Sequence, residues 1–183
     1  MLIALVFILL SGCSDDFLDT PPKDSYSDET FYVSPETAEL AITAIYSQFA
    51  GDNIGRYFIV TGSTIEEGTG TPGYFDQNLY EAAYRGINDA NVALEKIPAI
   101  DFEGNEDHKE QLLAEARTLR AYYYSLLHMF LGPVPMVTEV LTYDQYLDVE
   151  RPEDVAVTRN FIKSELQAVI PVLPSRAEAL NGK

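Results

Sequence analysis

The sequence contains no tryptophan, a single cysteine (Cys13) and only two histidines among 183 residues. One cysteine excludes an intramolecular disulfide. Basic residues are also scarce, because 12 lysines and arginines stand against 29 aspartates and glutamates, which gives a formal net charge of −17. A chain this acidic repels phosphate backbones and anionic lipid headgroups. We therefore predict no nucleic-acid partner and no membrane binding through charge.

The residue patterns of common enzyme chemistries are missing as well. His108 and His128 have no metal-ligand spacing with each other or with the cysteine. No Gly-x-Ser-x-Gly motif is present, and the glycine-rich stretch 68–73 lacks the Gly-Lys-Ser/Thr ending of a phosphate loop. We predict a protein that is not an enzyme, without catalytic residues or cofactor, and we identify no metal-binding residue.

The N-terminus has the features of a lipoprotein signal. Met1 to Leu10 is an almost unbroken apolar run, too short for the roughly 20 residues that span a bilayer but suited to a signal peptide. It ends in Leu-Ser-Gly-Cys, which resembles the site where cleavage leaves Cys13 to be acylated. We predict a signal peptide at 1–12, lipidation of Cys13 and a polar, proline-stiffened tether at 13–33. No Lys or Arg precedes the run, which leaves the true N-terminus open.

The segment 107–131 has the strongest periodicity in the chain. Apolar residues recur at steps of three and four, which is one face of a long helix, and they are Leu112, Ala116, Leu119, Tyr123, Leu126 and Phe130. Gly132 followed by Pro133 predicts a sharp end. Two arginines, Arg117 and Arg120, lie beside this face and have no carboxylate three or four residues away.

Partly buried guanidinium groups need acceptors, so these two arginines should pair with carboxylates on other helices. The candidates are Glu81, Asp89 and Glu165. The alternative is that both side chains extend along the surface and keep their charged ends in water.

Three further helices flank the central one. We predict a first from the N-cap Ser34 to Gly51, a second from Asp76 or Asn78 to Pro98, and another between residues 153 and 174. Val155, Ile162, Leu166, Val169 and Leu173 mark the apolar face of the last, and Pro171 should kink or end it early. The short polar loop 101–106 predicts an antiparallel hairpin of the second and third helices. The fold class is all-α, with helical hairpins and long irregular loops.

The glycine-rich stretch between the first two helices is the candidate ligand-binding region. Aromatic rings stand there among small residues that cannot bury them, and polar side chains follow. The residues that we predict to bind a ligand are Tyr74, Phe75, Tyr57 and Asn78. A segment with no function remains the alternative.

Several of these segments resemble one family. Glu115-Ala116-Arg117-Thr118-Leu119-Arg120-Ala121-Tyr122-Tyr123-Tyr124, followed by Leu127 and Gly132-Pro133-Val134-Pro135, is similar to the signature helix of SusD/RagB-type nutrient-binding lipoproteins. The segment Tyr80–Asn91 resembles the Tyr-x-x-Ile-x-x-Ala-Asn helix of the same family, without the tryptophan often seen just upstream. The acidic residues after Cys13 resemble its export signal to the cell surface.

The resemblance implies a tetratricopeptide-like fold and a lipid-anchored, surface-exposed location at the outer membrane. It also implies capture of oligosaccharides for a SusC-type TonB-dependent transporter, with aromatic residues of the glycine-rich stretch in the glycan platform. SusD-like proteins are more than twice this length, so we expect 34–183 to be the N-terminal helical part. Two alternatives stay open, which are a RagB-like peptide-binding lipoprotein and a tetratricopeptide-like scaffold without a small ligand.

Overall fold

The computed structural model describes residues 31–50, 72–176 and 179. For residues 49–50 and 72–78 it describes the backbone only. The chain divides into two compact units, residues 1–31 and 32–183, and the second holds the described helices. These are α3 (Pro35–Ala50), α5 (Pro72–Lys96), α6 (Glu106–Leu131), α7 (Tyr143–Leu147) and α8 (Val155–Val169). The 3₁₀ turn Ile97–Ala99 extends α5. No strand occurs in these ranges, which confirms the all-α prediction.

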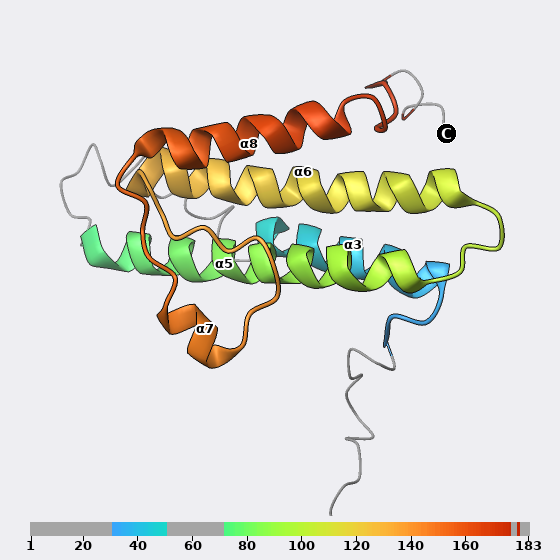
Figure 1. Ribbon diagram of the computed structural model, residues 1–183, viewed down its shortest axis with the longest axis horizontal. Coiled ribbons are helices and arrows are strands. Elements are labelled where there is room, and N and C mark those ends of the chain that lie inside the picture. The colour runs from blue at the N-terminus through green and yellow to red at the C-terminus, as the bar shows by residue number, and fades with distance from the viewer. Residues whose placement is uncertain (1–30, 51–71, 177–178, 180–183) are drawn as a thin grey trace, which may run out of the picture. The chain divides into compact units, whose positions relative to one another are not determined.

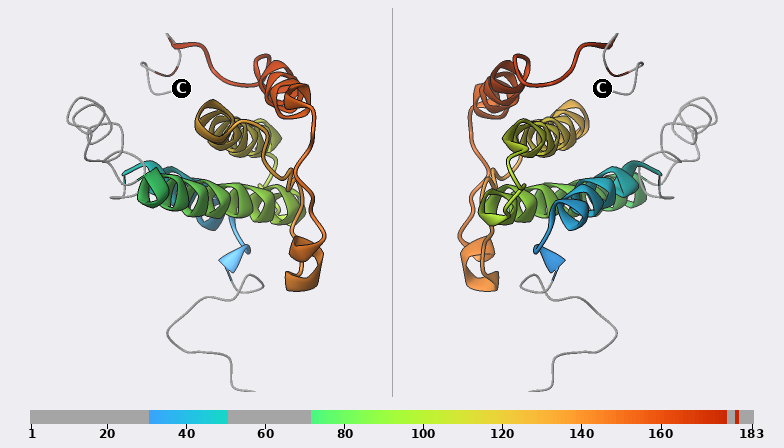
Figure 2. Two further views of the ribbon diagram at one scale, coloured as in Figure 1. Left: turned by 90° about the vertical axis from the view of Figure 1, so that its left-hand side faces the viewer. Right: turned by 90° about the vertical axis from the view of Figure 1, so that its right-hand side faces the viewer.

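The central helix is α6, as its periodicity predicted. It packs against α3 and α5 on one side and against α8 on the other, and the end-on views in Figure 2 show α6 between α8 and the α3–α5 pair. The α5–α6 hairpin runs antiparallel through the loop 100–105 (Figure 1). Between α6 and α8 the chain leaves the bundle, crosses α5 and forms the short helix α7 (Figure 1).

The predicted face of α6 is buried except at its end. Leu112, Ala116, Leu119, Tyr123 and Leu126 belong to the hydrophobic core, whereas Phe130 is 40% exposed. Phe130 lies in the last turn of the helix, where the prediction of a buried side chain was wrong. Gly132 ends the helix at φ 75° and ψ −140°, a backbone conformation that residues other than glycine strongly disfavour.

The first helix matches its prediction, but the second begins earlier than predicted. Ser34 caps α3 by accepting a hydrogen bond from the Thr37 N–H at 3.4 Å, while Thr37 Oγ1 accepts one from the Ser34 N–H at 3.1 Å. Helix α5 begins at Pro72 and not at Asp76 or Asn78. The glycines around Pro72 favoured a loop, yet proline at the first helical position is itself a start signal.

Gly86 marks the closest approach of α5 and α6. A Cβ built on it would overlap the Tyr123 ring at Cε2 and Cζ and would lie 2.8 Å from Cδ2. The ring is fully buried, and its hydroxyl donates to the Ile45 carbonyl oxygen of α3 at 2.6 Å. The missing side chain at Gly86 therefore lets one tyrosine of α6 reach across α5 to α3.

Helix α8 buries only part of the predicted face, since Val169 is buried and Ile162 packs against the core as predicted. Thr158, Glu165 and Val169 are buried, whereas Val155 and Leu166 are 44% and 39% exposed. The prediction was wrong for Val155 and Leu166, because the buried centre of the helix is the Glu165 carboxylate, which hydrophobic periodicity does not detect. The helix ends at Val169, so it stops early, just before Pro171.

Candidate functional site

Two tyrosines on one side of α5 form the core of a tyrosine-rich surface. The rings of Tyr80 and Tyr84 lie with centroids 4.4 Å apart and planes tilted by 42°. Residues four apart on a helix are neighbours on its surface, which explains the contact. Tyr80 is 40% exposed, while Tyr84 is half-buried beneath it. The exposed Tyr80 ring therefore packs against the less exposed Tyr84 ring.

Tyr84 is fixed in place by the segment that follows α6. Its hydroxyl donates to the Pro135 carbonyl oxygen at 2.6 Å, and its ring meets that of Tyr124 edge-on at 6.5 Å. The Tyr124 hydroxyl accepts from the Val137 N–H at 2.7 Å and donates to the Val137 carbonyl oxygen at 2.9 Å. Residues 135–137 are therefore hydrogen-bonded to α5 through Tyr84 and to α6 through Tyr124. These bonds fix the direction in which the chain continues toward α7.

Helix α7 adds a third tyrosine to the same surface. The Tyr146 hydroxyl donates to Asn88 Oδ1 of α5 at 3.2 Å, and Tyr146 is 38% exposed. A capping box between Thr142 and Gln145 starts this five-residue helix. Tyr143 is 78% exposed. We call Tyr80, Tyr84, Asn88 and Tyr146 the α5–α7 tyrosine surface.

The half-buried Tyr84 phenol is held in its neutral, hydrogen-bonding form. Burial raises the pKa of Tyr84 far above its usual range, and the neighbouring Tyr80 and Tyr124 add to the rise. Burial also raises the pKa of Tyr124. Glu81 and Arg85, which adjoin Tyr80 and Tyr84, lie 3.9 Å apart on α5, and the carboxylates Asp89 and Asp144 adjoin Asn88 and Tyr143. The chemistry offered here is flat rings with hydroxyl and amide groups.

Arg117, Arg120 and Glu165 form an ionic network that contacts the segment leading to α7. Glu165 Oε2 lies 2.6 Å from Arg120 Nη2, and Glu165 Oε1 lies 2.8 Å from Arg117 Nη2. Of the three predicted partners, Glu165 is confirmed for both arginines, while Glu81 and Asp89 lie beside Arg85 instead. Burial alone would raise the pKa of Glu165, but the hydrogen bonds from Arg117 and Arg120 outweigh it and hold that pKa below its usual range.

Asn91 connects this network to the chain after α6. Its amide oxygen accepts from Arg120 at 2.7 Å, and its amide nitrogen donates to the carbonyl oxygens of Val137 and Glu139, both at 3.1 Å. Arg120 also donates to the Thr138 carbonyl oxygen at 3.0 Å. The backbone of 137–139, which has no helix or strand to pair with, thus finds its partners in side chains.

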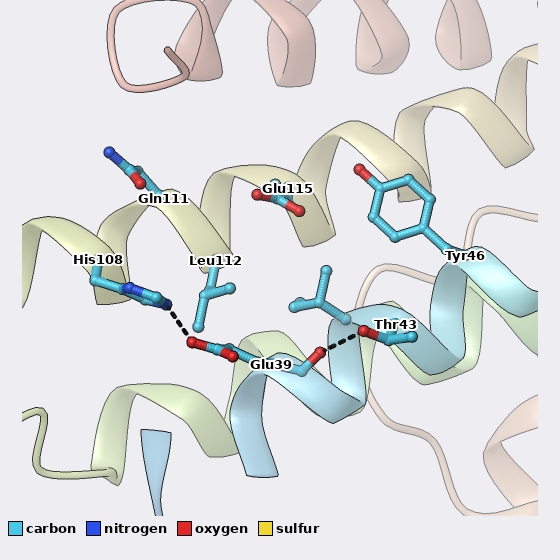
Figure 3. A pocket seen from close by; sticks show the side chains of 8 residues that line it. Glu39, Thr43, Tyr46, His108, Gln111, Leu112 and Glu115 are labelled. Atoms are coloured by element: carbon cyan, nitrogen blue, oxygen red, sulfur yellow. Dashed lines mark hydrogen bonds and ion pairs between the residues drawn. The ribbon is translucent and has the colours of Figure 1, made fainter. Parts of the chain in front are cut away.

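A hollow of about 250 Å³ lies between α3 and α6, with Ile42 and Leu112 among its lining residues. Figure 3 shows a polar pair across the two helices, in which His108 Nε2 lies 3.1 Å from Glu39 Oε1. Burial raises the pKa of Glu115, which a hydrogen bond from Tyr46 and the nearby His108 partly offset. The hollow lies where α3 meets α6, with Glu39 facing His108 and Tyr46 facing Glu115.

The predicted ligand-binding residues fall at the edge of the described part or outside it. The backbone of Tyr74, Phe75 and Asn78 belongs to the first two turns of α5, and their side chains lie outside the described residues. Tyr57, with the predicted apolar or strand segment 57–60, and Cys13 also lie outside. The helical start places Tyr74 six residues before Tyr80, which is about 1.7 turns, so the two positions face different sides of α5.

Sequence reasoning missed Tyr80, Asn88, Tyr143 and Tyr146 as surface residues. The spacing of Tyr80 and Tyr84 was visible in the sequence, but nothing local indicated that α7 returns to α5. Within the described ranges, no group of three or more His, Cys, Asp or Glu residues lies close enough to hold a metal ion. No helix among the described residues is long and apolar enough to cross a membrane.

Known proteins similar to this chain share one description. A sequence profile of the SusD-like family, described as starch-binding and associating with the outer membrane, matches residues 17–181. A SusD-like protein of Bacteroides ovatus is 27% identical over 97% of this chain and 35% of its own length. SusD-like protein P38 of Formosa agariphila is 29% identical over 85% of this chain and 33% of its own length. This chain therefore spans about a third of these relatives.

Solved structures show the same fold. A SusD-like carbohydrate-binding protein of Bacteroides fragilis superposes with a TM-score of 0.69 at 24% identity, over 81% of this chain and 33% of that one. A laminarin-binding SusD-like protein superposes with a TM-score of 0.66 at 24% identity, over 80% of this chain and 36% of that one. The tetratricopeptide-like helical fold expected from the sequence is confirmed. With the profile matched over nearly the whole sequence, the chain belongs to the SusD-like family.

Proposed function

We propose that this protein is a cell-surface lipoprotein that captures oligosaccharides for import through a SusC-type TonB-dependent transporter. The observation that carries the proposal is the SusD-like profile over residues 17–181, whose family is described as starch-binding and outer-membrane-associated. Two similar solved structures bear the descriptions carbohydrate-binding and laminarin-binding. The protein acts by binding and has no catalytic role.

The binding site includes Tyr74, Phe75, Tyr57 and Asn78. Aromatic faces stack on the apolar faces of sugar rings, while amide groups donate and accept hydrogen bonds to sugar hydroxyls. The backbone of three of these residues belongs to the start of α5, a helix whose later residues lie in the hydrophobic core.

The first test measures binding of soluble protein to a panel of starch and laminarin oligosaccharides and of peptides, by calorimetry. Tyr74→Ala and Phe75→Ala should each weaken oligosaccharide binding by about 5–30-fold, which corresponds to about 1–2 kcal/mol. If only peptides bind, the RagB-like alternative replaces this proposal. If neither class binds, the scaffold alternative does.

The anchor is tested separately. Cys13 follows Leu-Ser-Gly after an apolar run, and cleavage there would leave 13–33 as a lipid-anchored tether after the signal peptide 1–12. Because several acyl chains on one residue hold a protein firmly on a membrane, Cys13→Ser should move the product from the membrane fraction to the soluble one. The measurement is detergent phase partitioning of both proteins, expressed with an intact signal peptide. Wild-type protein in the aqueous phase would rule out the anchor.

A further inference from the structure

We propose that the hollow between α3 and α6 is a binding site for a short aliphatic diamine, a chain of methylene groups with an ammonium group at each end. The proposal is separate from the oligosaccharide function, because every residue that lines the hollow belongs to α3 or α6. The observation that carries it is the order of side chains along the hollow, which is polar at both ends and apolar between them.

Each end of the hollow pairs a residue of α3 with a residue of α6. At one end His108 Nε2 lies 3.1 Å from Glu39 Oε1, and at the other the Tyr46 hydroxyl donates to the Glu115 carboxylate. Glu115 follows His108 by seven positions on α6, which is about 10 Å of helix. Figure 3 shows Leu112 between these two positions. The two carboxylates therefore lie at opposite ends of the hollow.

The floor between the two ends is apolar. Ile42 of α3 and Leu112 of α6 line it and are only 3% and 6% exposed. Methylene groups that pack on these side chains leave water and gain the stabilisation of apolar burial. The volume of about 250 Å³ lies below the range of about 300–1,000 Å³ that is usual for pockets of drug-sized ligands. The ligand that matches is small, with polar ends and an apolar middle.

Both ends favour a positive charge. None of the described residues that line the hollow is a lysine or an arginine, and the adjacent Lys109 is paired with Glu106 at 3.0 Å. His108 offsets the charge of Glu39 only when it is protonated. Burial raises the pKa of Glu115, so its ionised form gains from a nearby cation. An ammonium group at each end would supply that charge and donate hydrogen bonds to the carboxylate oxygens.

The separation of the carboxylates distinguishes a diamine from other cations. In the part of the chain that the structure describes, no three His, Cys, Asp or Glu side chains come together closely enough to hold a metal ion. A small cation with one charge meets only one carboxylate, whereas a diamine meets both. The net charge of −17 attracts every cation, so the test must separate this spacing from general attraction.

The experiment measures binding of diaminopentane, with an amine at each end, and of pentylamine, with one, by calorimetry. Salt at about 0.15 M shortens the reach of the general attraction to about 8 Å. Glu115→Gln should weaken both amines by about tenfold, because it removes a charged acceptor that is partly buried. Glu39→Gln should weaken diaminopentane alone, by about two- to fivefold, since the Glu39 side chain is 55% exposed.

The matched control is Glu110→Gln, which removes an exposed carboxylate of the same helix that does not line the hollow. This variant should bind both amines as wild type does. Circular dichroism melting checks that each variant is folded.

Four results would overturn the proposal. Wild type could bind neither amine, or bind diaminopentane no more tightly than pentylamine. Equal weakening by Glu110→Gln and Glu115→Gln would show that the amines respond to the net charge of the chain. Binding of Ca²⁺ in place of the amines, lost in Glu39→Gln and Glu115→Gln, would make the hollow a metal site. Each result leaves the oligosaccharide proposal standing, because that proposal is tested on other ligands and other residues.

Discussion

Glu165→Ala should lower the free energy of unfolding by about 3–5 kcal/mol, because removal of one partner leaves a buried charge uncompensated. The Arg120 side chain is only 9% exposed, and it donates to Glu165 Oε2 at 2.6 Å. Without the carboxylate this guanidinium keeps Asn91 and the Thr138 carbonyl oxygen, which are neutral acceptors. Arg117 suffers less, since its side chain is 37% exposed and water can replace the lost partner.

The measurement is urea-induced unfolding of the purified variants, with Glu81→Ala as the matched control. Glu81 is also a glutamate paired with an arginine, but the pair is 3.9 Å apart and both side chains are about half exposed or more, at 49% and 65%. Exposed pairs contribute about 0–1 kcal/mol, so this control should change stability little. Equal losses in Glu165→Ala and Glu81→Ala would contradict the buried-network interpretation.

The same network predicts a dependence on acid. The pKa of Glu165 is lowered in the folded protein, so its stabilising contribution is complete above the unfolded value of about 4.5 and disappears as the pH falls through the folded value. Wild type should therefore lose stability below about pH 4.5 more steeply than Glu165→Gln, whose side chain does not ionise.

The sequence allowed accurate prediction wherever apolar periodicity and end signals agreed. For α6, a stripe at steps of three and four and the Gly132-Pro133 stop gave both the buried face and the end. Helix α8 was placed correctly and Val169 and Ile162 lie on its inner face as predicted, but Val155 and Leu166 are exposed because the buried centre is Glu165. The unpaired Arg117 and Arg120 were the only local sign of that carboxylate, and they narrowed the choice to three residues.

Other parts of the site had no local signal. The helix α7 is five residues long and has no apolar face of its own, so periodicity could not reveal it. The return of α7 to α5 depends on tyrosine and asparagine hydrogen bonds to backbone carbonyls about 50 residues away, such as Tyr84 to Pro135. Contacts of this range follow from the packed fold and not from neighbouring residues. The tyrosine surface could therefore be recognised only in three dimensions.

Tyr123→Ala should lower the free energy of unfolding by about 3–5 kcal/mol, the usual cost of removing a large buried ring. The ring is fully buried between α5 and α6, and its hydroxyl donates to the Ile45 carbonyl oxygen, so α3 loses a partner as well. Urea unfolding measures the loss. A change below about 0.5 kcal/mol, typical of surface sites, would mean that the ring is not part of the core.

The ring also explains why Gly86 is a glycine, and a double-mutant cycle tests this. In wild type, Gly86→Ala should cost about 1–3 kcal/mol, because the new methyl group collides with the Tyr123 ring and the core must shift. In the Tyr123→Ala background the same change should instead stabilise the protein by up to about 1 kcal/mol, since alanine is the better helix former and the space is free. Tyr123→Leu, which preserves more volume, serves as the background if the alanine variant does not fold. A Gly86→Ala effect of the same sign and size in both backgrounds would show that the glycine is there for a reason other than this ring.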